Sequence, residues 1–153
     1  MQDRVHVLAR PPFVYALGLV FTIWLTKVYP DYLRFEGDYF LFIISTLSLI
    51  FGLSTASWGW QSLTDRNVDP NFKPVGTFVV RGAYKYSRNP IYLGFTFLYI
   101  GILLFYKTFL LFITLPIILI YIRTIVIRKE ERYLERVFGD SYIKYKKSVN
   151  RWM

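Results

Sequence analysis

The sequence predicts an all-α integral membrane protein with about four transmembrane helices, because its apolar residues form long blocks and its basic residues flank them. Hydrophobic residues make up 54% of the 153 residues and aromatic residues 20%, more than the core of a soluble domain can absorb. A soluble helical bundle is the alternative, but its helices rarely include two uncharged runs of this length. We therefore expect one membrane domain over residues 1–153.

Four apolar blocks mark the expected crossings. A hydrocarbon core about 30 Å thick is crossed by roughly 20 apolar helical residues. The third block is short, and Tyr92 and Tyr106 mark its two ends, as aromatic belt residues do. The four blocks cover residues 13–29, 40–60, 91–105 and 109–127.

The segments between and after these blocks differ in length and character. Residues 61–90 form a long loop interrupted by prolines and glycines, and loops of this length are often functional. A tight hairpin at residues 106–108 is expected before the fourth helix, which Pro116 is expected to kink. The tail, residues 128–153, is predicted to form one or two amphipathic helices that break near Gly139.

The positive charge, +9 in total, is concentrated beside particular membrane segments. The loop 61–90 and the tail are basic, whereas the loop between the first two helices is acidic. Four crossings place the N-terminus, the long loop and the tail on one side, which the positive-inside rule makes cytoplasmic. This distribution favours membrane lipids and argues against nucleic acid as a partner.

Several kinds of chemistry are excluded by what the chain lacks. It has no cysteine, so it forms no disulfide, thiolate metal site or cysteine nucleophile. His6 is the single histidine, and we expect it at the membrane interface and predict no metal site. No glycine-rich turn follows a strand, so a Rossmann-type nucleotide-binding domain is not expected.

Two polar segments could carry chemistry. Residues 87–90, Ser-Arg-Asn-Pro, precede the third helix, whose free N–H groups could receive an anion. The alternative is a simple helix cap, with Arg88 resting on lipid phosphate. Glu130 and Glu131 lie about 100° apart on a helix, so one can face the bundle while the other forms an ion pair. Arg123, inside the fourth block, either snorkels to the interface or contacts a substrate.

Four motifs of the chain together resemble those of a known family. The first is residues 77–94 (TFVVRGAYKYSRNPIYLG), and residues 88–92 within it form the second. The third and fourth are residues 130–134 (EERYL) and 138–145 (FGDSYIKY). In this order and spacing the chain resembles the superfamily of isoprenylcysteine carboxyl methyltransferases and phospholipid methyltransferases. The resemblance covers residues 67–149, about half of the chain.

The resemblance implies a membrane methyltransferase that binds S-adenosylmethionine in a helical cleft at the cytoplasmic face, releases S-adenosylhomocysteine and acts on a lipophilic or lipid-linked acceptor. Arg123 and Arg128 are candidate contacts to an anionic acceptor, and no catalytic base is assigned. Carried over by position, the cofactor-binding residues are Gly76, Thr77, Phe78, Val79, Tyr84, Asn89, Pro90, Ile91, Tyr92, Glu130 and Glu131.

Two departures from the family pattern and two other functions stay open. Asn89 replaces the family's histidine, and Val126 lies near the position of an expected substrate-contacting arginine. The chain is also shorter by a helix than several relatives, so a homo-oligomer could complete its site. The alternatives are an NADPH-dependent membrane reductase of the same fold and a non-enzymatic membrane protein.

Overall fold

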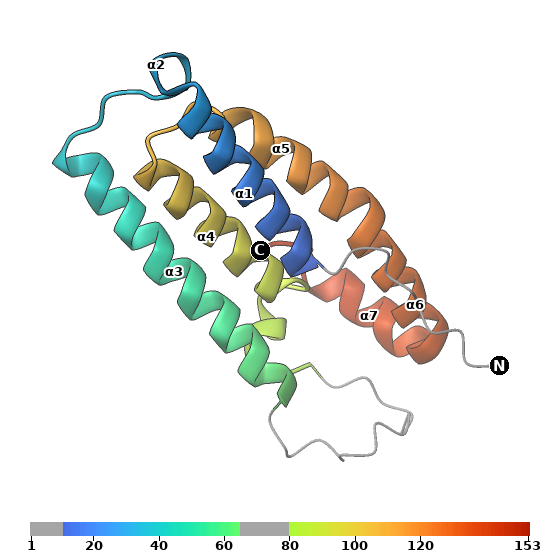
Figure 1. Ribbon diagram of the computed structural model, residues 1–153. Coiled ribbons are helices and arrows are strands. Elements are labelled where there is room, and N and C mark those ends of the chain that lie inside the picture. Colours follow the sequence, from blue (N-terminus) through green and yellow to red (C-terminus); the bar gives the residue numbers. More distant parts are fainter. Residues whose placement is uncertain (1–10, 65–79) are drawn as a thin grey trace.

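The computed structural model describes residues 11–64 and 80–153, and these residues are helical with no strand among them (Figure 1). A single antiparallel bridge joins Arg34 and Thr108. The elements are α1 (Pro11–Val28), α2 (Pro30–Leu33), α3 (Tyr39–Thr64), the 3-10 helix η1 (Gly82–Lys85), α4 (Pro90–Phe105), α5 (Leu111–Tyr121), the π-helix η2 (Ile122–Ile127), α6 (Arg128–Phe138) and α7 (Asp140–Ser148).

All four predicted apolar blocks are helical, and three of the helices are long and apolar enough to cross a membrane. These three are Pro11–Val28, Tyr39–Leu63 and Leu111–Phe138. α4 has 16 residues and is therefore only about 24 Å long, less than the roughly 30 Å hydrocarbon core. The structure thus confirms the helical class and gives three candidate spans beside a shorter apolar helix.

Glycines let α3 and α4 pack with their backbones in close contact. A Cβ added to Gly94 would lie 2.5 Å from the backbone nitrogen of Ala56, and one added to Gly52 would lie 2.7 Å from that of Leu98. Small residues at such crossings are the usual way for membrane helices to approach closely. This contact fixes α4, whose first turn carries the candidate site, against α3.

The hairpin between α4 and α5 is as tight as predicted. Lys107 turns the chain in the left-handed region, with a φ of 53°. Its carbonyl accepts a hydrogen bond from the Phe35 amide at 2.9 Å, and the Phe109 amide donates to the Leu33 carbonyl at 2.9 Å. The α1–α3 connection therefore closes this end of the bundle.

Buried hydroxyls join α1 to α4 and α5. Thr22 lies 3.1 Å from the Tyr99 hydroxyl, which in turn donates to Thr114 at 2.8 Å. Tyr15 and Thr96 form a second such pair at 2.8 Å. Lipid offers no hydrogen-bond partner, so polar side chains inside a helical membrane bundle pair with each other.

The last of the three long helices, Leu111–Phe138, changes geometry before it becomes polar. α5 contains Pro116 and continues directly into the π-helical segment η2, and then into α6. Within η2, Ile122, Val126 and Ile127 are all buried in the core. The helix begins at Leu111 and not at residue 109, because the Leu110 amide is held by the Thr108 hydroxyl at 3.3 Å in the preceding turn.

The polar tail forms two helices, as predicted, with the break at Gly139. This residue adopts a φ of 54°, which a glycine tolerates and other residues rarely do. α6 and α7 lie at the end of the bundle where α4 begins (Figure 1). The tail is therefore placed beside the Ser-Arg-Asn-Pro turn, residues 87–90.

Candidate functional site

The turn before α4 is held by its own polar groups. The buried Ser87 hydroxyl accepts a hydrogen bond from the Asn89 amide at 3.1 Å, and Pro90 is the first residue of α4. The side chain of Asn89 does not cap the helix. It donates to the Arg151 carbonyl at 2.9 Å, so this side chain is oriented by the tail and not by α4.

Glu130 and Tyr92, which lie on separate motifs, are brought into direct contact. The Tyr92 hydroxyl, in the first turn of α4, donates to Oε1 of Glu130 at 2.6 Å. Glu130 lies in the first turn of α6 and is partly buried. Its Oε2 accepts no hydrogen bond within the described ranges 11–64 and 80–153. The site therefore presents an oriented carboxylate with one oxygen still available.

Glu131 faces a different set of partners. Its side chain is only 8% exposed, and Oε1 lies 2.8 Å from the Arg88 guanidinium. Arg151 binds the same carboxylate in a fork, with Nη2 2.7 Å from Oε2 and Nε 3.1 Å from Oε1. The adjacent acids thus diverge as their helical spacing predicts. Arg88 is paired with Glu131, a partner that the cap interpretation did not include.

Tyr84 completes one wall of this region from the 3-10 helix η1. Its carbonyl accepts a hydrogen bond from the Tyr145 hydroxyl of α7 at 2.8 Å. Burial raises the pKa of Tyr84 above its ordinary value, and the proximity of Tyr145 and Glu130 adds to the shift. Burial likewise raises the pKa of Tyr145 to about 12. Both phenols are neutral at physiological pH, and Tyr145 acts as a donor that ties η1 to α7.

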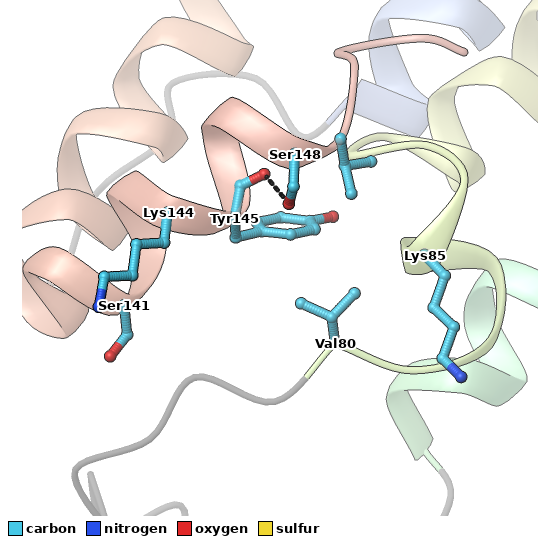
Figure 2. Close-up of a pocket in the computed structure, with 7 residues that line it drawn as sticks. Val80, Lys85, Ser141, Lys144, Tyr145 and Ser148 are labelled. Carbon is cyan, nitrogen blue, oxygen red and sulfur yellow. Dashed lines mark hydrogen bonds between the residues drawn. The ribbon is translucent and has the colours of Figure 1, made fainter.

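An open pocket of about 440 Å³ lies between η1 and α7 (Figure 2). Tyr145 lies at its centre, and Val80 and Lys85 border it on the side of η1. Ser141, Lys144, Ser148 and Val149 line the side of α7 and the residue after it. None of the predicted cofactor-binding residues within the described ranges is among its lining residues.

The remaining predicted residues are placed as follows. Pro90 is buried and Ile91 partly buried, both beside Gly59 of α3. Arg123 and Arg128 are exposed and form no ion pair among the residues that the structure describes. Gly76, Thr77, Phe78 and Val79, and also His6, lie outside the described residues.

Arg151 is the site residue that sequence reasoning missed. It contacts Asn89 through its carbonyl and Glu131 through its guanidinium. A basic residue in a basic tail carries no signal of such a role, and Arg151 lies beyond the four motifs. Only the fold shows that the segment after α7 returns to the start of α4.

These features define a helical membrane protein with a polar site where α4 and α6 begin. The chain belongs to the phospholipid methyltransferase family, whose profile matches residues 41–141, about two-thirds of the chain. No curated protein and no solved structure gives a significant match. The match confirms the resemblance drawn from the motifs. Together with the three long apolar helices, it makes the chain an integral membrane protein of the methyltransferase class.

Proposed function

We propose that this protein is an S-adenosylmethionine-dependent methyltransferase that acts on a lipophilic or lipid-linked acceptor at the membrane interface. The carrying observation is the 2.6 Å contact between Tyr92 and Glu130, which joins two family motifs into one site. The basic end of the bundle, with both termini, faces the cytoplasm in this proposal, in accordance with the positive-inside rule.

The chemistry of the side chains fits the cofactor. S-adenosylmethionine carries a sulfonium and an ammonium group, which favour carboxylate and aromatic partners. Glu130 offers an oriented carboxylate, one oxygen of which accepts no hydrogen bond from residues 11–64 and 80–153, and Tyr84 and Tyr92 supply aromatic rings beside it. Residues 76–79 and 89–91 complete the proposed binding set by family position, together with Glu131.

When bound, the cofactor supplies an electrophilic methyl group, so no nucleophilic side chain is needed. The protein's own contribution is to align the two reactants and to exclude water. Tyr92 holds the Glu130 carboxylate in one orientation, and the apolar helices provide a low-dielectric wall. Arg123 and Arg128 are exposed on the continuous helix Leu111–Phe138, which also carries Glu130. They are suited to hold an anionic group of the acceptor.

Calorimetric titration of the detergent-solubilised protein tests the proposal. We expect S-adenosylmethionine and S-adenosylhomocysteine to bind and NADPH not to bind. Binding of NADPH alone would replace the methyltransferase with a reductase of the same fold, and binding of none of the three would favour a non-enzymatic protein.

A further inference from the structure

Residues 150–152, here called the return segment, follow α7 and lie against the turn before α4. The Asn150 carbonyl accepts a hydrogen bond from the Arg88 amide at 3.0 Å. The Arg151 carbonyl accepts one from the Asn89 side chain at 2.9 Å. Beside its internal hydrogen bond from the Asn89 amide to Ser87, the turn therefore takes further hydrogen bonds from a segment more than sixty residues later in the chain.

The side chain of Arg151 adds a second attachment, to α6. Its guanidinium forms two hydrogen bonds with the Glu131 carboxylate, a geometry that gives direction as well as strength. Arg88 contacts the same carboxylate from the turn before α4. A buried carboxylate is costly unless it is paired, and Glu131 is paired with these two arginines at 2.7–2.8 Å and with Lys146 at 4.0 Å.

The neighbour of Arg151 anchors the return segment. Trp152 is partly buried and packs against the apolar core that includes Ile122 and Val126. The segment is thus held by apolar contact at one residue and by polar contact at the two before it. Its position is fixed well enough for the carbonyl of Arg151 to orient a side chain.

We propose that Arg151 is a positioning residue for the cofactor site. Its carbonyl orients the Asn89 side chain, and its guanidinium holds α6 against the start of α4 through Glu131. These contacts keep Glu130 and Tyr92 together, because Glu130 directly precedes Glu131 in α6 and Tyr92 lies three residues after Asn89. This role rests on the proposed function, and Arg151 lies outside residues 41–141, which the family profile matches.

A double-mutant cycle on cofactor affinity tests the Arg151–Glu131 contact, with S-adenosylhomocysteine as the titrant. Arg151→Met and Glu131→Gln should each weaken binding about tenfold or more, as expected for loss of a charge-assisted contact. The double variant should bind no more weakly than the single variant with the lower affinity, because both substitutions remove the same Arg151–Glu131 contact. Arg136→Met is the matched control, an exposed arginine of α6 that should bind like the wild type. Additive losses, or an unchanged affinity of Arg151→Met, would overturn the positioning role.

Hydrogen exchange separates this role from the proposed function. In Arg151→Met, amides 87–89 should exchange faster than in the wild type and in Arg136→Met, without ligand. If the wild type fails to bind S-adenosylhomocysteine, the proposed function is overturned. If it binds but exchange at amides 87–89 is unchanged in the variant, the positioning role alone is overturned.

A conservative variant keeps the test decisive if Arg151→Met does not fold. Arg151→Lys retains the positive charge but cannot form the two-pronged contact. We expect it to melt at the wild-type temperature and to bind S-adenosylhomocysteine several-fold more weakly. Wild-type affinity in Arg151→Lys would contradict the inference.

Discussion

The hydroxyl of Tyr92 lies 2.6 Å from Glu130 although 38 residues separate the two in the chain. The contact crosses from the first turn of α4 to the first turn of α6, so both helix starts must be placed correctly for it to form. Its short distance is typical of a hydroxyl that donates to a carboxylate. The contact makes the two residues one unit in any account of ligand binding.

Glu130→Gln should weaken binding of S-adenosylmethionine by about 10- to 100-fold, since a charge-assisted contact contributes on the order of 1.5–3 kcal/mol. The variant keeps the shape of the side chain but removes its charge. Calorimetry measures the loss. Glu135→Gln serves as the control, because Glu135 lies on the same helix but pairs with Lys146 at 2.7 Å. Equal affinities of the two variants would mean that Glu130 stabilises the fold and does not contact the cofactor.

Tyr92→Phe should have a smaller effect than Glu130→Gln. The ring and its packing remain, whereas Glu130 loses the donor that orients it. We expect affinity to fall several-fold, as for the loss of one hydrogen bond worth about 1 kcal/mol. Tyr86→Phe is the comparison, since Tyr86 is exposed and the centroid of its ring lies 5.7 Å from that of Trp58. A loss as large as that of Glu130→Gln would mean that the hydroxyl itself touches the ligand.

Gly94→Val should destabilise the bundle. A Cβ at this position would meet the α3 backbone at 2.5 Å, so the helices must separate. Overpacking of this kind typically costs about 1–3 kcal/mol, and a backbone contact puts the cost at the upper end. Unfolding in a denaturing detergent measures it. Ser57→Val, on the exposed side of α3, should unfold like the wild type, and equal stability of the two variants would contradict the close packing.

The proposed orientation can be tested with introduced cysteines, because the chain has none of its own. Glu36→Cys lies between α2 and α3, and Lys147→Cys lies on α7, at opposite ends of the bundle. In intact cells a membrane-impermeant maleimide should label residue 36 and spare residue 147. Both should react after permeabilisation. The reverse pattern would invert the orientation.

The apolar elements could be predicted because their signals are local. Long apolar runs predicted all four helical blocks, and Gly139 predicted the break in the tail. The short length of α4 was also predicted, since the third block, residues 91–105, differs from Pro90–Phe105 by one residue. Four crossings were predicted, and three helices are long enough by themselves.

Some contacts of the site could be predicted from the sequence and others could not. Glu130 and Tyr92 were predicted from motifs, and the fold brings them together. The partner of Arg88 could not be predicted, because its carboxylate lies 43 residues away and its choice depends on which of two adjacent acids faces inward. The contact of Arg151 with Asn89 is made by a backbone carbonyl, which is present in every residue and therefore leaves no trace in a sequence.

The π-helical segment η2 has a consequence for comparing this chain with others. A π-turn contains about one residue more than an α-turn. The segment Ile122–Ile127 therefore accommodates one extra residue without rotating α6, so that Glu131 still points toward Arg88. A related chain that is one residue shorter here would present its acids to the same partners. An alignment gap within this segment is thus compatible with an unchanged site, whereas a gap between Arg128 and Glu131 is not.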